Sequence, residues 1–538
     1  MNKHTNLVII VALVLGWGFD FLFWGKPIGI NFAIYLTACL LGGALVLLTN
    51  ARKPAFKSLW LVLPFVFFAT ITFVRQEPLT MVLSIMGALV SLGLLTVTYL
   101  GGRWMRYSLF DYFKKFFLLI GNIIVLPILF FRERKLNLAG VRRMPVKPVV
   151  RGVLIAVPVV IFFAVLLAAG DIVFRQQIIN FFDQFNLGRI PEYIARLIIM
   201  LFGAYVLMGV YLYAALKSTD EQLLGEDKPI ISRFLGFTEA AIVLGSVSIL
   251  FLLFVIIQFR YFFGGEVNIG VKGFTYSEYA RSGFSELIAV ACFSLLMILG
   301  LGTVTKRESD RQKRIYSGLS VGIVVLVIVI LVSAYQRLML AIDWHGFSRL
   351  RLYPRVFLIW VGILFVAVIV LEIMRRERHF AFAALLAALG FAITICALNV
   401  DAAIVRHNTY RTIDDKHFNV NYLTTLSTDA VPELAEAYQD SSLPAVTHDG
   451  VGAALVCYIH SEMYENYSDT DWRSINLSRW LAVNALNKVG PHLQDYTVSK
   501  YSGHYQVETP DHLYLYQCDQ LIRKMQLPST SGGIPPGN

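Results

Sequence analysis

The segment "FAFAALLAALGFAITICAL", residues 380–398, decides the fold class of this chain. It runs for nineteen residues without a charged side chain, and a helix of roughly 20 apolar residues crosses the hydrocarbon core of a bilayer. Comparable runs recur upstream, beginning with "VIIVALVLGWGFDFLFW" at residue 8. We predict eleven membrane-spanning helices, at residues 6–24, 30–49, 58–74, 79–100, 150–172, 192–215, 238–262, 286–304, 316–336, 355–374 and 380–399.

The composition agrees with a membrane protein. Of 538 residues, 57% are hydrophobic and 15% are charged, whereas soluble domains carry about 25% charged residues. No nucleotide-binding loop, nucleophile elbow or zinc-ligand spacing occurs in the sequence, so we predict no catalytic residue, metal or cofactor. The formal charge of +11 comes without the aromatic-interleaved basic motifs of nucleic-acid binding, and we expect no nucleic-acid partner.

Two segments near the spans need a separate interpretation. The run "FFLLIGNIIVLPILFF", 116–131, is shorter than a normal span, contains Asn122 and Pro127, and has basic residues at both ends. It is typical of an interfacial or re-entrant helix. The first apolar run lacks a small-residue cleavage site and contains Asp20, which predicts an uncleaved first span and not a removed signal peptide.

The distribution of Lys and Arg predicts the orientation. With eleven spans and a cytoplasmic N-terminus, the inner loops hold 25 Lys and Arg residues and the outer loops hold 11. Cytoplasmic loops are enriched in these residues. Counting 116–131 as an additional span would reverse everything downstream and place the clusters at 306–314 and 375–378 outside. The bias therefore favours an extracytoplasmic C-terminus, with basic inner loops facing anionic lipid.

A composition change near Asp401 marks a second domain. From there on the chain holds 9 Lys and Arg against 16 Asp and Glu, and helix-like apolar spacing replaces the long apolar runs. We expect a small helix-rich extracytoplasmic domain, with one strand near residue 505. The predicted segments are N-terminal helices 1–100, a basic cytoplasmic loop 101–149, a helical core 150–400, the C-terminal domain 401–528 and a disordered end 529–538.

Cysteine and histidine usage adds two observations on this domain. Cys457 and Cys518 are its only cysteines, and an extracytoplasmic location would permit them to form a disulfide. Seven of the ten histidines lie there. Their spacing matches no metal-binding motif, so we expect them to be ordinary surface residues.

Charged and aromatic side chains gather in three segments that the topology assigns to the outer face. "GFTYSEYARSGFSEL", 273–287, predicts an amphipathic helix, and "RLMLAIDWHGFSRLRLYPR", 337–355, and "LNVDAAIVRHNTYR", 398–411, follow later spans. We expect one outer-face polar cluster in which arginines grip an anionic group. Its candidate residues are Tyr276, Glu278, Tyr279, Arg281, Glu286, Asp343, His345, Arg349, Arg351, Asp401 and Arg406.

A simpler interpretation of the same residues remains open. Tyrosine, tryptophan and arginine are common at the membrane–water interface, where they anchor the ends of spans. On that interpretation the three segments are anchors without a shared site.

Four separated motifs carry a family resemblance. "TYSEYARSGFSEL", "WHGFSRLRLY", "YLTTLSTDAVPEL" and "DWRSINLSRW" occur in this order and resemble the bacterial membrane family catalogued as domain of unknown function 4173, sister to 4153. The similarity runs from about the fifth span to Arg479. One departure is Asn421, where the pattern has an aspartate. The resemblance implies a multi-pass protein of a bacterial cytoplasmic membrane, without an assigned role.

These observations favour an all-α, polytopic membrane protein that is not an enzyme and acts in envelope sensing, scaffolding or assembly. A permease for a small or anionic solute is the first alternative, and a membrane enzyme or binding protein acting on lipid or envelope precursors at the outer leaflet is the second. Expected partners are membrane lipid and a protein bound through the C-terminal domain. No feature of the sequence sets an oligomeric state.

Overall fold

We describe the fold from a computed structural model. It describes residues 5–137, 190–219, 223–224, 232–263, 284–411, 419–465, 467, 471–501, 504–511 and 515–518, with isolated positions between 152 and 177. The long helices are α1 (Thr5–Phe23), α2 (Ile30–Thr49), α4 (Val62–Val74) with the short α3 (Phe56–Leu59) before it, α5 (Pro78–Thr98), α6 (Leu109–Asn137), α9 (Ile190–Leu216), α10 (Phe237–Phe263), α12 (Phe284–Val304), α13 (Asp310–His345), α14 (Arg349–Ile373) and α15 (Phe380–Leu398).

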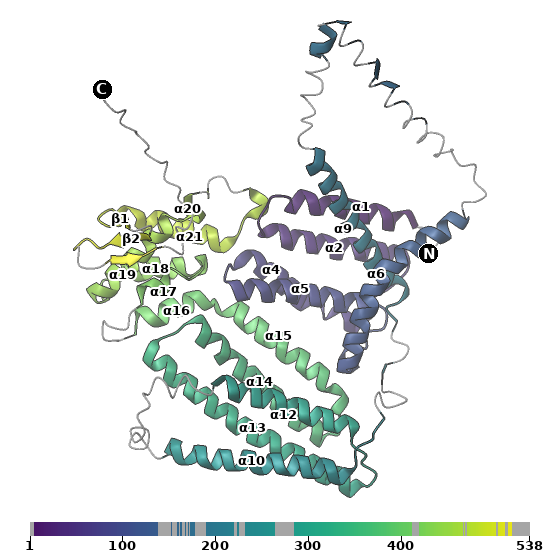
Figure 1. The fold of residues 1–538 in the computed structure, drawn as a ribbon, viewed down its shortest axis with the longest axis vertical. Coiled ribbons are helices and arrows are strands. Elements are labelled where there is room, and N and C mark those ends of the chain that lie inside the picture. The colour runs from purple at the N-terminus through teal and green to yellow at the C-terminus, as the bar shows by residue number, and fades with distance from the viewer. Residues whose placement is uncertain are drawn as a thin grey trace, which may run out of the picture. The chain divides into compact units, whose positions relative to one another are not determined.

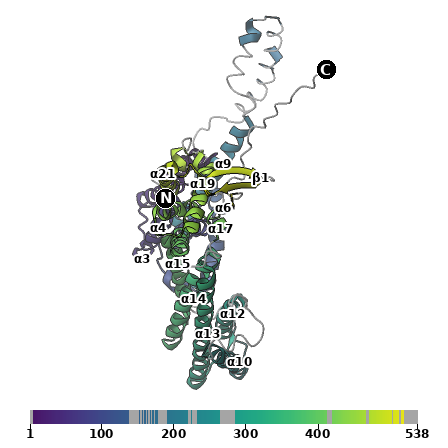
Figure 2. The same cartoon turned by 90° about the vertical axis from the view of Figure 1, so that its left-hand side faces the viewer.

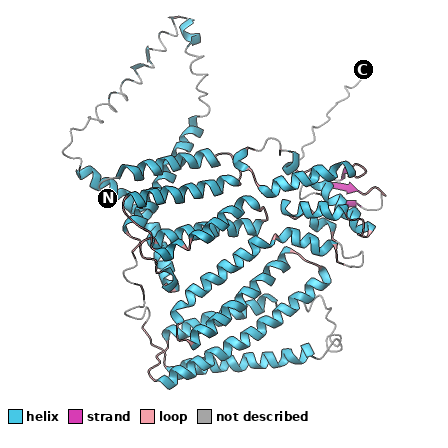
Figure 3. Cartoon of the chain, turned by 180° about the vertical axis from the view of Figure 1, so that it is seen from behind, coloured by secondary structure: helices cyan, strands magenta, loops and turns pink. Residues whose placement is uncertain are grey.

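Eleven stretches of the described residues are long and apolar enough to cross a membrane. Each of the helices just named contributes to one of them, with α3 and α4 forming a single stretch. Figure 3 shows that helices make up nearly all of the described chain. The predicted class, an all-α polytopic membrane protein, is confirmed.

The chain divides into two compact units, and unit 1 holds residues 1–25, 37–53 and 115–219. Its main contact is the packing of α1 along α9. The two helices approach closely at Gly16, where an added Cβ would lie 2.4 Å from the carbonyl oxygen of Met200. Near the C-terminal end of α1, Arg196 Nη2 lies 2.6 Å from Asp20 Oδ2. The ion pair with Arg196 compensates the charge of the buried Asp20, which explains why a charged residue is tolerated within the first apolar run.

Unit 2 holds the remaining residues, and its apolar helices form a series of neighbours. α10 and α12 both pack against α13, α14 packs between α13 and α15, and α15 also contacts α5, which forms a hairpin with α4. Figure 1 shows α15, α14 and α13 side by side, and Figure 2 shows α10 and α12 on one side of α13. The core between α10, α12, α13 and α14 consists of branched aliphatic side chains such as those of Leu244, Ile323 and Val327.

Local sequence signals fix both ends of the 36-residue helix α13. Its N-terminus has a capping box, in which Ser309 and Gln312 bond to each other's backbone N–H groups, a pairing that satisfies free donors of the first turn. Its C-terminus stops at Gly346, which has a positive φ of 74°. An added Cβ at that glycine would lie 2.6 Å from Asn408 Oδ1, so a side chain is excluded by conformation and by space.

The C-terminal domain belongs to unit 2 and contains helices and one small sheet. Its α-helices are α16 (Val400–Thr409), α17 (Val420–Leu423), α18 (Val431–Gln439), α19 (Ala445–Ile459), α20 (Glu462–Glu465) and α21 (Leu477–Val489), and its strands are β1 (Thr497–Tyr501), β2 (His504–Glu508) and β3 (Leu515–Gln517). The strands pair in the antiparallel order β1-β2-β3. Short 3-10 turns, η7 (Thr428–Ala430) and η8 (Trp472–Ser474), precede α18 and α21.

The domain is centred on α19, whose residues from Gly450 to Tyr458 are buried. Cys457, on this helix, forms a disulfide with Cys518, just beyond β3, and their Cα atoms are 5.4 Å apart. That separation lies within the range of Cα–Cα distances that a disulfide requires, and the pairing expected from the sequence is therefore present. The disulfide ties the edge of the sheet to the central helix.

One expectation on helices differs from the structure, and another lies largely outside the described residues. The 116–131 run belongs to α6, a continuous helix of 29 residues, of which Leu109–Glu133 qualifies as a membrane-spanning stretch. The run is short because basic residues flank it at both ends, but the helix continues through Lys114 and Lys115 before it and Arg132 after it. The predicted 150–172 span lies largely outside the described residues. The eleven stretches found among the described residues include α6.

Candidate functional site

The C-terminal domain covers a group of buried charges at one end of the unit 2 helices. Figure 1 shows α16, α17 and the elements after them gathered at this end of α4, α5, α14 and α15. Three carboxylates there are at most 4% exposed, and two arginines reach them. We call this group the buried polar network: Arg75, Glu77, Arg349, Tyr353, Asp401 and Asp429.

The strongest pair in the network joins Arg349, the first residue of α14, to Asp401 in the first turn of α16. Arg349 Nε donates to Asp401 Oδ1 at 2.8 Å and its Nη2 donates to Oδ2 at 2.5 Å. Asp401 is fully buried, and its Oδ2 also accepts from the backbone N–H of Ser427 at 2.7 Å. A two-pronged contact of this kind fixes the relative direction of both side chains. The pair therefore locks the start of the domain to the start of α14.

Glu77 connects the same arginine to the α4–α5 turn. Its carboxylate caps α5 by accepting from the N–H groups of Leu79 and Thr80, at 3.0 and 2.6 Å. The Tyr353 hydroxyl also donates to it, and Arg349 Nε lies 4.0 Å away. A negative charge at a helix N-terminus interacts favourably with the free N–H groups there. The cap thus explains part of how Glu77 is stabilised at 1% exposure.

Asp429, in η7, reaches the α4–α5 turn from the domain side. Its Oδ2 accepts from the backbone N–H groups of Gln76 and Glu77, at 2.8 and 2.9 Å. Its Oδ1 accepts no hydrogen bond and lies 3.9 Å from Arg75 Nη1. Burial raises the pKa of the Asp429 carboxyl above its ordinary value, although the two N–H donors act in the opposite direction. The network holds three carboxylates and two guanidinium groups, so one negative charge lacks a full counterpart.

A second set of contacts holds the η8–α21 region against the helix ends. Asn476, which caps α21, donates to the carbonyl oxygens of Thr72 and Arg75 at the end of α4. The N–H of Ile30, at the start of α2, donates to the carbonyl of Ile475 at 2.9 Å. These bonds use free backbone groups of helix termini. The domain therefore completes the polar ends of α2, α4, α5 and α14.

The structure brings only some of the predicted cluster residues together. Arg349 and Asp401 form the pair described above. Arg406 lies elsewhere on α16 and pairs with Glu433 at 2.7 Å, with 69% of its side chain exposed. Arg351 donates to the carbonyl oxygen of Gly346 at 3.1 Å and so stabilises the turn between α13 and α14.

Three other predicted residues are exposed at helix ends. Asp343 and His345 are exposed at the end of α13, and Glu286 is exposed in the first turn of α12. Tyr276, Glu278, Tyr279 and Arg281 lie outside the described residues. The predicted cluster is therefore seen in part, as the Arg349–Asp401 pair.

The sequence reasoning missed Arg75, Glu77, Tyr353 and Asp429. A signal for Glu77 was present, because an acidic residue before Pro78 and an apolar run is typical of a helix start. Asp429 lies in "YLTTLSTDAVPEL", a motif that was noted for its resemblance only. No signal identified Tyr353, since its contact with Glu77 spans 276 positions in the sequence.

The geometry of the network suits attachment more than chemistry. Its carboxylates are buried, and each accepts hydrogen bonds that hold it in place. No group of three metal-ligating side chains is found in the described part of the chain. Removing one member of a buried ion pair costs about 3–5 kcal/mol, because the other charge is left without compensation. The network therefore fastens the domain to the helices.

Fold and site together define a polytopic helical membrane protein with a C-terminal domain fastened onto its helix ends. Comparison with protein families identifies which one. The sequence model of the domain of unknown function DUF4153 matches residues 62–437, so the chain belongs to this family. Searches of curated proteins and of solved structures gave no match.

Proposed function

We propose that this protein is a non-enzymatic membrane scaffold that acts in envelope assembly, with the C-terminal domain as a fixed platform on its spans. The buried polar network is the observation that carries the proposal. A platform must keep its orientation, and Arg349 and Asp429 each join the domain to a helix end, while Glu77 lies beside Arg349 from the α4–α5 turn.

We further propose a bacterial cytoplasmic membrane, a cytoplasmic N-terminus and an extracytoplasmic domain. The excess of Lys and Arg at the opposite helix ends supports this orientation. The Cys457–Cys518 disulfide also supports it, because such bonds persist in oxidising compartments. A protein partner would then meet the platform outside the membrane.

Distance measurements between two spin labels test the platform. One label replaces Ser441, which is exposed in the domain, and the other replaces Val366, which is 53% exposed on α14. We expect one narrow distance distribution in the full chain and a broad one after Arg349→Gln. Two separate distance populations in the protein with an unmodified network would contradict a fixed platform and would favour the alternating states of a permease.

Complementation in cells adds the functional arm. An envelope defect of a strain that lacks the protein should be restored by the wild type and by Arg406→Gln, whose ion pair is exposed. Arg349→Gln, expressed at the same level, should fail to restore it. Full restoration by Arg349→Gln with a broad distance distribution would overturn the proposed role of the platform.

A further inference from the structure

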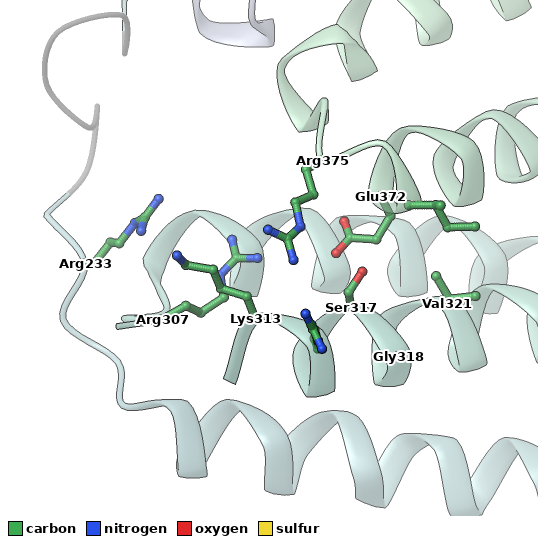
Figure 4. Close-up of a pocket in the computed structure, with 10 residues that line it drawn as sticks. Arg233, Arg307, Lys313, Ser317, Gly318, Val321, Glu372 and Arg375 are labelled. Carbon is green, nitrogen blue, oxygen red and sulfur yellow. The ribbon is translucent and has the colours of Figure 1, made fainter. Parts of the chain in front are cut away.

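A basic pocket lies at the end of the unit 2 helices opposite the C-terminal domain. Its volume is about 630 Å³, and it is lined by the start of α13, the end of α14 and the loops before α10 and α13. Figure 4 shows Arg307, Lys313 and Arg375 converging on one space, which Arg233 faces from the other side. We call this the basic pocket and define its charged lining as Arg233, Arg307, Lys313, Arg314, Glu372 and Arg375.

The charge of this lining is unbalanced. Five cationic side chains and one carboxylate surround the cavity. Lys313 pairs with Asp310 at 3.2 Å, but Arg314 and Arg375 make no side-chain hydrogen bond or ion pair within the described part of the chain. Like charges gathered in a concave site beside apolar helices focus a positive potential and attract anions. Guanidinium groups prefer phosphate and carboxylate, which accept two parallel hydrogen bonds.

The position of the pocket points to a ligand at the membrane surface. The apolar part of α13 begins just after Arg314, and that of α14 ends at Ile373. The cavity therefore lies where a spanning helix enters the headgroup layer, and Val321 and Ile373 form an apolar part of its wall. Basic pockets between spanning helices at the cytoplasmic surface bind acidic lipid headgroups.

An apolar cavity beside the basic pocket supplies the second half of such a site. It has a volume of about 420 Å³ and is lined by α12, α13, α14, α15 and the start of α6, with side chains such as those of Leu296, Leu299 and Leu371. Glu372 lines both cavities. The guanidinium of Arg307, in the basic pocket, stacks 4.5 Å from the ring of Tyr316, which lines the apolar one. The two cavities thus share part of a wall.

We propose that the basic pocket binds the phosphate-bearing headgroup of an anionic membrane lipid, with an acyl chain of that lipid in the apolar cavity. A phosphate needs cationic donors from several directions, and the pocket provides them from three segments. The apolar cavity favours a lipid over a free phosphate, which would leave this cavity without a partner. The site is independent of the proposed scaffold function and lies at the other end of the helices.

Lipid binding to the purified full chain tests the assignment. The pocket variant is Arg314→Gln with Arg375→Gln, and the matched control is Arg311→Gln with Arg376→Gln, which removes the same charge from exposed neighbours outside the lining. Native mass spectrometry would count retained phosphatidylglycerol and cardiolipin, with phosphatidylcholine as the zwitterionic reference. We expect the pocket variant to weaken anionic-lipid binding about tenfold or more, and the control to change it less than about twofold.

Thermal unfolding supplies an independent readout. Anionic lipid should raise the unfolding temperature of the wild type and of the control, because a ligand that binds the folded state stabilises it, and should have little effect on the pocket variant. Equal melting of all three proteins without lipid shows that they fold alike. If both variants lose lipid equally, general surface charge explains the binding and the pocket assignment is wrong. If inorganic phosphate stabilises the wild type and lipid does not, the ligand is a soluble phosphate and the lipid assignment is overturned.

Discussion

At the scale of single residues, Arg349 and Arg406 offer a natural comparison. Both form two-pronged contacts with a carboxylate, Arg349 with Asp401 and Arg406 with Glu433. They differ in environment, since the Arg349 side chain is 20% exposed and that of Arg406 is 69% exposed. Water screens an exposed pair and competes for its hydrogen bonds. The two ion pairs, although similar in geometry, should therefore contribute very differently to the free energy of unfolding.

We expect Arg349→Gln to lower the free energy of unfolding by about 3–5 kcal/mol, because it leaves Asp401 buried with its charge uncompensated. Arg406→Gln should cost less than about 1 kcal/mol. Denaturant or thermal unfolding of the detergent-solubilised protein measures both. Equal losses in the two variants would show that the buried pair has no special role.

Glu77 shows why the contacts of the buried polar network could not be predicted from the sequence. Sequence reasoning placed Arg349 and Asp401 on the same face of the membrane, since span counting gives the side on which a loop lies. It could not pair them, because the contact depends on which helices are neighbours. Glu77 and Asp429, which meet at the α4–α5 turn, are 352 positions apart in the sequence, and no local pattern encodes a contact over that separation.

At the scale of elements, α14 and α15 approach each other closely at one glycine, Gly390. An added Cβ at Gly390 would lie 2.1 Å from the ring of Trp360, and Trp360 Nε1 donates to Thr394 Oγ1 at 3.0 Å. The hydrogen bond restricts the indole, so the ring has little freedom to move aside. Gly362, also on α14, has nothing within 4 Å of an added Cβ.

Gly390→Ala should therefore destabilise the protein by about 1–3 kcal/mol through overpacking. Gly362→Ala should be neutral or slightly stabilising, because alanine is the better helix former. Melting of the two variants in the same detergent gives the comparison. An unchanged Gly390→Ala protein would mean that the α14–α15 contact adjusts without cost.

The helices themselves were largely predictable, and α6 shows the limit. Long uncharged runs can satisfy their backbone in lipid only as helices, so composition is nearly sufficient. The charges before residue 116 separate this run from the start of α6. Asp111 among them is 2% exposed and accepts from the N–H groups of Ser108 and Leu224. A charged residue that binds a neighbouring segment cannot be distinguished in sequence from one that ends a span.

At the scale of the whole molecule, the sequence predicts the orientation in the membrane only through the distribution of Lys and Arg between the loops. The basic pocket and the C-terminal domain lie at opposite ends of the unit 2 helices, so the inner side is fixed once either end is located. The 306–314 and 375–378 clusters have the same predicted side whether 150–172 or α6 is counted as the fifth span. The exchange does, however, move the seven Lys and Arg residues from Arg132 to Arg151 to the outer side, so the count of 25 to 11 becomes 18 to 18. These two clusters, and not the total count, then carry the predicted orientation.

Cysteine labelling in intact cells tests the orientation. Ser441→Cys, in the domain, should react with a membrane-impermeant maleimide, and Glu308→Cys, before α13, should react only after the cells are opened. The unmodified chain gives the background from its free cysteines, Cys39, Cys292 and Cys396. Labelling of position 308 and not of 441 in intact cells would reverse the assignment.

The contact between Asp429 and the α4–α5 turn has a consequence for biosynthesis. Translation proceeds at about 5–20 residues per second, so the 352 positions between Glu77 and Asp429 correspond to roughly 20–70 s of synthesis. During that interval the α4–α5 hairpin is already made, while the N–H groups of Gln76 and Glu77 lack their acceptor. Arg349 is made later, 52 positions before its partner Asp401. The nascent protein is consequently incomplete at this membrane face until its last quarter emerges from the ribosome. A chain truncated before Asp401 would expose the Arg349 charge, a feature by which quality-control proteases could distinguish unfinished copies from finished ones.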